Sequence, residues 1–98
     1  MGPSTFRVMF EGDEGARLAA TIIELDNPGS MVDQQMRTHQ LTLTLPLDSA
    51  LVFRSHQVSA TAVLQTNSNV QGEIYKGDKL RKRASAQGQY AVIMLEGQ

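Results

Sequence analysis

Residues 37–47 read Arg-Thr-His-Gln-Leu-Thr-Leu-Thr-Leu-Pro-Leu, and hydrophobic and polar side chains alternate through most of this stretch. One face carries His39 and then four leucines, Leu41, Leu43, Leu45 and Leu47. Because successive side chains of a β-strand point to opposite faces, this period of two indicates a strand with one buried face. Pro46 has no N–H group to donate to a ladder, so we expect that end of the strand to lie at the margin of a sheet.

The same alternation extends to segments on both sides. Residues 5–10 alternate, with two phenylalanines and a valine on one face. Residues 51–66 form a longer alternating stretch, which we expect to be bent or bulged in its middle. A short strand is predicted over 70–75. Residues 89–95 are hydrophobic at nearly every position, which predicts a strand buried on both faces.

Residues 16–25 fit either a strand or a helix. Three hydrophobic residues have helical spacing, and Asp13 could cap a helix that begins there. The β-branched run at 21–23 and the glycine-containing loop before it favour the second strand of a hairpin. After the turn-forming residues 27–30, residues 31–36 predict either a single helical turn or a wide loop.

Together these patterns predict an all-β fold, a small antiparallel β-sandwich or barrel of about six to seven strands with room for one short helix. The length of 98 residues fits one domain, residues 1–98. Hydrophobic residues make up 41% of the chain and charged residues 19%, which is enough hydrophobic surface for one modest core.

Composition excludes several classes of protein. The chain has no cysteine, so disulfides, thiolate nucleophiles and cysteine metal sites are excluded. Its longest hydrophobic run, residues 90–95, is far shorter than the roughly 20 residues of a membrane-spanning helix. The first residues lack the basic and hydrophobic regions of a secretory signal. The compartment stays open, with the cytoplasm or a virion slightly favoured.

Separated charge is the clearest candidate for a functional signal. The net charge is only −1, but residues 1–30 carry two cationic and five anionic side chains, a net of −3, and residues 71–98 carry five and three, a net of +2. The candidate interaction residues are three acidic and five basic side chains: Glu11, Asp13, Glu14, Lys76, Lys79, Arg81, Lys82 and Arg83.

The first functional hypothesis follows from these two groups. The acidic loop of one copy could meet the basic loop of the next, and head-to-tail contacts generate rings or filaments. The Thr, Gln and Ser side chains on the outward faces leave strand edges with little charge to oppose pairing. We therefore expect a non-enzymatic interaction or assembly module, such as a particle or appendage subunit, that self-associates or docks on a protein partner through strand edges and charged loops.

Two alternatives stay open. The basic loop at 76–83, flanked by Tyr75 and Tyr90, could bind nucleic acid in an OB-like domain. A small inhibitor or adaptor could instead present one of two loops, 12–15 or 66–69, to an enzyme.

Catalytic, cofactor and metal sites are not predicted. His39 and His56 are the only imidazoles, and the place of His39 on a hydrophobic face favours a partly buried histidine with one nitrogen hydrogen-bonded. Neither a nucleophile-elbow serine motif nor a glycine-rich phosphate loop is present. Asp13 and Glu14 are adjacent, so they point to opposite sides of any strand. We expect no enzymatic activity, no cofactor, no bound metal and no membrane insertion.

Overall fold

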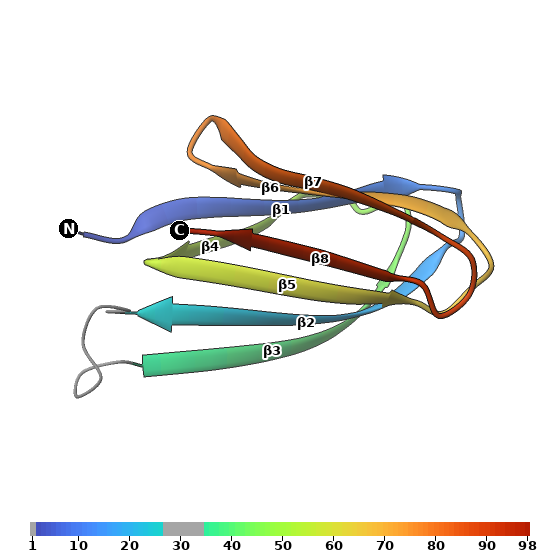
Figure 1. Cartoon of the computed structure of the whole chain (residues 1–98), viewed down its shortest axis with the longest axis horizontal. Coiled ribbons are helices and arrows are strands. Elements are labelled where there is room, and N and C mark those ends of the chain that lie inside the picture. The colour runs from blue at the N-terminus through green and yellow to red at the C-terminus, as the bar shows by residue number, and fades with distance from the viewer. Residues whose placement is uncertain (1, 27–34) are drawn as a thin grey trace.

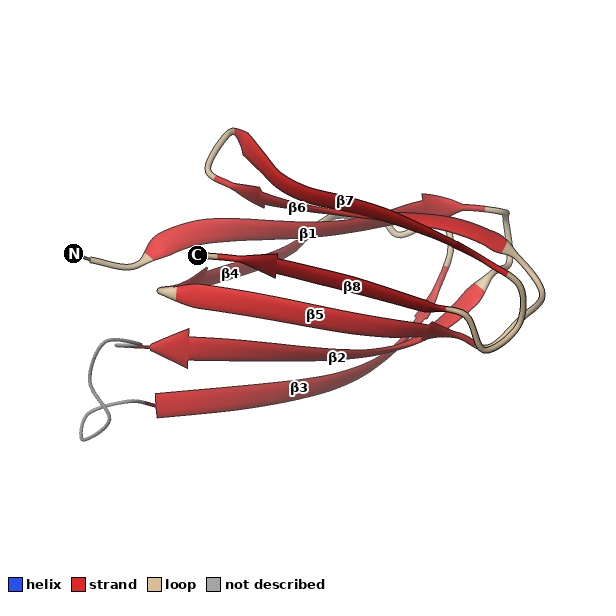
Figure 2. Ribbon diagram, viewed as in Figure 1, coloured by secondary structure: helices blue, strands red, loops and turns tan. Residues whose placement is uncertain are grey.

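The computed structural model describes residues 2–26 and 35–98, and the described residues form strands and loops without a helix (Figure 2). The fold is all-β. The strands are β1 (Ser4–Gly12), β2 (Arg17–Asp26), β3 (Gln35–Thr44), β4 (Leu51–Ser55), β5 (Gln57–Leu64), β6 (Asn69–Lys76), β7 (Lys79–Gln87) and β8 (Val92–Gly97).

Two four-stranded antiparallel sheets pack face to face in a sandwich-like arrangement (Figure 1). One sheet has the strand order β4-β1-β6-β7, and the other has the order β3-β2-β5-β8. Alternate side chains of the inner strands fill the space between the sheets, as the period of two requires. The largest fully buried hydrophobic side chains are Phe6, Val8, Leu18, Ile22, Val58, Leu64, Ile74 and Ile93.

Residues 17–26 form a strand, which resolves the choice between strand and helix at 16–25. β2 pairs with β3 on one side and with β5 on the other, so ladders on both sides satisfy its backbone groups. Its inward residues reach the core, and Ile22 is fully buried. The helical turn considered for 31–36 lies mostly outside the described residues, and residues 35 and 36 begin β3.

The prediction of six to seven strands was too low, because residues 2–26 and 35–98 already contain eight. The stretch 51–66 is two strands in different sheets, since β4 pairs with β1 and β5 pairs with β2. Buried Ser55 lies at the crossing, where its single hydroxyl proton is shared between the Asp26 carboxylate at 3.1 Å and the Leu25 carbonyl at 3.3 Å. The other additional strand is β7, which includes most of the basic run.

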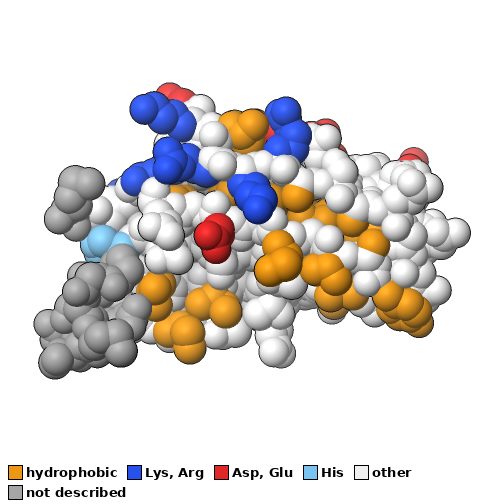
Figure 3. Space-filling view, in the orientation of Figure 1, with side chains coloured by type: hydrophobic (Ala, Val, Ile, Leu, Met, Phe, Trp, Pro, Cys, Tyr) orange, Lys and Arg blue, Asp and Glu red, His pale blue; other side chains and the backbone are white. Residues whose placement is uncertain are grey.

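The prediction that 89–95 is buried on both faces was also wrong. β8 begins at Val92, and Tyr90 before it occupies a turn with a φ of 71°. Since β8 is an edge strand with one face toward solvent, only its inward residues are buried, while Val92 and Met94 are 49% and 64% exposed. Hydrophobic side chains are therefore visible on the surface along β8 (Figure 3).

Candidate functional site

The connection between β1 and β2 carries the predicted acidic residues. The Asp13 carboxylate accepts the N–H of Asn69 at 2.8 Å, and the Asp13 N–H donates to the Asn69 carbonyl at 3.0 Å. A Cβ on Gly12 would overlap that same carbonyl, so the close approach of the two strands needs glycine. Glu11 and Glu14 are exposed. Asp13 therefore anchors the loop to β6, while Glu11 and Glu14 are the charges available to a partner.

The basic run at 76–83 forms a β-hairpin around the turn signal at residues 76–79. Lys76 ends β6, residues 77 and 78 form the turn, and Lys79 begins β7. Gly77 has a φ of 57°, which favours glycine, and its N–H donates to the Thr5 carbonyl at 2.8 Å. The ladders of both strands therefore hold the basic side chains on a defined backbone.

A bulge changes the register within this hairpin. Ile74 pairs with Lys82, but the next residue, Tyr75, pairs with Leu80. Arg81 therefore has no partner position in β6. A bulge of this kind bends its strand and increases the local twist. As a result, the β6–β7 hairpin diverges from the neighbouring strands toward its tip (Figure 1).

Arg83 differs from the other predicted cations because it is bound to a buried carboxylate. Its Nε and Nη2 donate to one oxygen of Glu73 at 2.9 and 2.6 Å. Glu73 is only 5% exposed and also accepts the hydroxyl of Tyr75 at 3.3 Å. The hydrogen bond with Glu73 raises the pKa of Arg83, and the Arg7 guanidinium lies 5.0 Å from the centroid of the Tyr75 ring. Arg83 thus belongs to a structural cluster on the outer face of this sheet.

Three of the five predicted basic side chains extend into solvent without an ion pair among residues 2–26 and 35–98: Lys79, Arg81 and Lys82. Lys76 is half-buried, and its Nζ donates to the backbone oxygen of Gln98 at 3.0 Å. The Lys and Arg side chains gather over the β6–β7 end of the visible surface (Figure 3). The hairpin therefore presents a compact group of exposed cations.

The acidic loop and the basic hairpin lie at opposite ends of the sandwich. In the antiparallel pair of β1 and β6, Gly12 is opposite Val70 and Phe6 is opposite Lys76. At about 3.3 Å per residue, these pairs are roughly 20 Å apart, and the two turns extend beyond them. The molecule measures 42 × 25 × 20 Å, and the two turns lie toward different ends of its long axis (Figure 1).

A second charged cluster, which the sequence did not predict, joins β2 to β3. Glu24 is buried and accepts from the His39 Nε2 at 2.7 Å and from the Arg37 guanidinium at 3.3 Å. The same guanidinium donates to Asp26 at 3.1 Å, and the His39 ring lies 5.4 Å from the ring of Phe53. His39 is therefore half-buried with one nitrogen hydrogen-bonded. The cluster forms because the register of β2 and β3 places Glu24 opposite Arg37, and the sequence alone does not predict that register.

Geometry gives this second cluster a structural role. The Ser55 hydroxyl donates to Asp26, and the Nδ1 of His56 lies 3.6 Å from the same carboxylate oxygen. In a serine-nucleophile triad the hydroxyl would instead bond to the imidazole. The hydrogen bond from Ser55 lowers the pKa of Asp26 more than any other contact, and His56 and the charge of Arg37 lower it further. Among the described residues, no group of three or more potential ligands could hold a metal ion.

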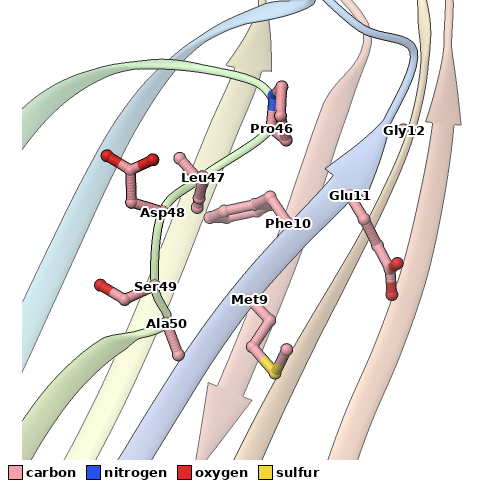
Figure 4. Close-up of a pocket in the computed structure, with 9 residues that line it drawn as sticks. All are labelled: Met9, Phe10, Glu11, Gly12, Pro46, Leu47, Asp48, Ser49 and Ala50. Atoms are coloured by element: carbon pink, nitrogen blue, oxygen red, sulfur yellow. The ribbon is translucent and has the colours of Figure 1, made fainter.

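A pocket of about 360 Å³ lies between the end of β1 and the loop of residues 46–50 (Figure 4). The ring of Phe10 points toward Leu47 and forms a hydrophobic floor. The carboxylates of Glu11 and Asp48 point away on opposite sides of the pocket. A ligand site normally combines a hydrophobic lining with polar groups that converge on one point. This pocket has a hydrophobic lining, but its carboxylates do not converge on one point, so we assign no ligand or reaction to it.

Comparison with known proteins gives no relative: no protein-family model, no curated protein and no solved structure matches this chain. A search of the described residues for a helix of sufficient length and hydrophobicity to cross a membrane finds none. The function must therefore be argued from the surfaces of the fold.

Proposed function

We propose that this protein is a non-enzymatic assembly module whose copies associate head to tail. The acidic β1–β2 loop of one copy would contact the basic β6–β7 hairpin of the next. One observation carries the proposal: exposed charges of opposite sign lie at opposite ends of an elongated fold. A contact between two different surfaces leaves one surface of each kind free on every pair, so copies can add in a row or close into a ring.

The charges that support this contact are exposed, and their exposure determines how the association should depend on salt. Glu11 and Glu14 face solvent at one end, and Lys79, Arg81 and Lys82 face solvent at the other. Complementary exposed charges steer and orient an encounter more than they supply affinity. Their interaction is screened over about 8 Å at physiological salt. Head-to-tail association should therefore be strong at low salt and weaker as salt is added.

Nucleic-acid binding has less support from the geometry. Arg7 stacks on the ring of Tyr75, and Tyr90 lies at the other end of β7 from the hairpin tip. Base stacking on either ring beside the basic tip would therefore need rearrangement. Two sheets with eight strands also differ from the five-stranded barrel of an OB-fold.

An inhibitor that inserts a loop has less support as well. Asp13 ties the 12–15 loop to β6 through two hydrogen bonds. In the 66–69 loop, Ser68 is buried, and the hydroxyls of Thr66 and Ser68 are 2.5 Å apart. The 66–69 loop is also tied to its neighbours, since the Arg17 N–H donates to the Thr66 hydroxyl at 3.1 Å and the Gly88 N–H donates to the Ser68 carbonyl at 2.9 Å. Both loops are therefore held against the fold, whereas an inserting loop should project from it.

A charge-swap experiment tests the proposed function. One variant combines Lys79→Glu, Arg81→Glu and Lys82→Glu, so both of its ends are acidic. A second combines Glu11→Lys and Glu14→Lys, so both of its ends are basic. We expect wild-type protein to show a mass that rises with concentration in light scattering at low salt. Each variant alone should lose that rise, and an equimolar mixture of the two should regain it, because opposite charges then meet again.

The control is Arg17→Glu, which changes the net charge by the same amount per substitution but lies beside the acidic loop, away from the hairpin. This variant should still associate through its unchanged basic end. A wild-type protein whose mass does not rise with concentration at low salt, or a mixture whose mass is no greater than that of either folded variant alone, would refute head-to-tail association.

A further inference from the structure

The two sheets leave four strand edges, and three of these are protected against pairing. β4 has only five residues and carries the exposed Arg54. β7 carries the bulge at Arg81 and a run of cations, and bulges and positive charge are the usual means of blocking an edge. β8 packs against β7, and Lys82 reaches the pocket beside Met94 on β8.

The fourth edge, β3, has none of these protections. It pairs with β2 over its full length of ten residues, from Gln35 to Thr44, without a register shift. It contains no proline, glycine, lysine or acidic residue. Its one permanent charge is Arg37, whose guanidinium already contacts Glu24 and Asp26. A long, regular edge whose single permanent charge is already ion-paired is a feature that natural proteins avoid unless another element covers it.

The side chains of β3 are also incompletely covered. Thr38, Gln40 and Thr42 face outward and are exposed, while Leu41 and Leu43 face the core but are only partly buried. β3 packs mainly on β2 and lies at the lower margin of the sandwich in Figure 1. A further strand beside β3 would therefore continue both the backbone ladder and the hydrophobic layer.

We infer that the strand that covers β3 is the β3 of a second copy, antiparallel to the first about a twofold axis near Gln40. The two four-stranded sheets would then become one continuous sheet of eight strands. This inference deepens the proposed function and rests on it in one respect, since both require that the chain associates with itself.

Self-complementarity is the argument for this occupant. With the axis near Gln40, Thr38 of one copy lies opposite Thr42 of the other, and paired threonines favour a sheet. In the same register, the inward Leu41 and Leu43 lie opposite His39 and Arg37 of the other copy, so the partly buried leucines gain contact with the imidazole ring and the aliphatic stem of the arginine. The two Arg37 side chains would be about 20 Å apart along the strands, whereas a parallel arrangement would place them side by side. A basic peptide would find no opposite charge along this edge, and an acidic peptide would find only Arg37, which Glu24 and Asp26 already contact.

Cysteine cross-linking tests the pairing directly, because the chain has no cysteine of its own. Directly opposed residues of antiparallel strands have Cα atoms about 4.5–5.5 Å apart, within the range of a disulfide. We expect Gln40→Cys to form a disulfide dimer under mild oxidation. Thr38→Cys and Thr42→Cys should cross-link weakly alone and strongly when mixed. Thr5→Cys, exposed on the other sheet, is the control and should stay monomeric. Equal self-linking at 38, 40 and 42 would overturn the antiparallel arrangement.

The charged variant Gln40→Lys provides a second readout, with Thr5→Lys as its control. Near the axis two lysines would face each other, so we expect the salt-resistant dimer to dissociate, with its dissociation constant raised at least tenfold in light scattering. Thr5→Lys should leave the dimer unchanged, and circular dichroism should show both variants folded.

The outcomes separate this inference from the proposed function. Association that is lost at high salt and in the hairpin variant, but is unaffected by Gln40→Lys, would overturn β3 pairing and leave head-to-tail association intact. A dimer that resists salt and the hairpin substitutions but is lost in Gln40→Lys would support β3 pairing alone. A wild-type monomer under all conditions would overturn both.

Discussion

Replacing Gly12 with alanine is expected to destabilise the fold at its acidic end. Gly12 lies at the end of β1 directly opposite Val70 of β6. A Cβ at this position would lie 2.8 Å from the Cα of Val70 and would overlap the carbonyl of Asn69. Both neighbours are backbone atoms, so a side-chain rotation cannot make room. The two strands must separate there, and the anchoring of Asp13 is the first structure affected.

The magnitude follows from what that separation breaks. The two hydrogen bonds between Asp13 and Asn69 contribute about 1 kcal/mol each, and overpacking costs about 1–3 kcal/mol where the surroundings can partly relax. Because the separation that breaks both bonds also relieves most of the overlap, the overpacking cost lies near the lower end of its range, and we expect Gly12→Ala to lower the free energy of unfolding by about 3 kcal/mol. For a domain of this size that corresponds to a fall in Tm of about 12–24 °C.

Gly2→Ala provides a matched control, because it is the same substitution at a glycine whose added Cβ would meet nothing within 4 Å. An exposed change of this kind should alter the stability by less than about 0.5 kcal/mol. Thermal unfolding followed by circular dichroism at high salt measures both variants without head-to-tail association. If Gly12→Ala melted at the same temperature as Gly2→Ala, the close approach of the two strands would not be what requires glycine.

Two further predictions concern the cluster that joins β2 to β3. Glu24→Ala removes the buried acceptor of the His39 hydrogen bond, so it should cost about 2 kcal/mol in urea unfolding, while exposed Glu96→Ala should cost less than about 0.5 kcal/mol. The hydrogen bond from Ser55 holds the pKa of Asp26 below its ordinary value of 3.8. The ionised Asp26 carboxylate therefore stabilises the fold fully above pH 3.8, and this stabilisation is lost as the pH falls through the folded-state pKa. The Tm of wild-type protein should therefore fall more steeply below about pH 4 than that of Asp26→Asn, and parallel curves would contradict this assignment.

The period of two along the chain predicted the class of fold because it reports the burial of alternate residues directly. β3 shows this most clearly, since its leucines face the core and its threonines face solvent as the spacing indicated. The alternation did not predict which strands share a sheet. At 51–66 the inward positions change from odd numbers (51, 53 and 55) to even numbers (58, 60, 62 and 64) where the chain changes sheets. No glycine or proline marks the crossing, and the prediction of one bent strand overlooked this change of phase.

The candidate site was predictable only as far as it depends on local sequence. The charges of Glu14 and Lys79 could be predicted to be exposed at turns, and the structure places Glu14 in a turn and Lys79 at the first position of β7, directly after a turn. The ion pair between Arg83 and Glu73 could not be predicted, because it depends on a bulge that sets the two residues opposite each other. Spacing along the chain gives no register between strands, and register decides which charges are paired.

The two proposed contacts have different symmetry and different physical origins, so they should separate experimentally. Pairing through β3 is twofold and closed, and it rests on backbone hydrogen bonds and leucines, which salt does not screen. Head-to-tail contact is open and rests on exposed charges, which salt does screen. Because β3 lies along one side of the sandwich and the charges lie toward its ends, one copy can use both surfaces at once. Raising the salt should therefore convert paired rows of copies into discrete dimers before any monomer forms.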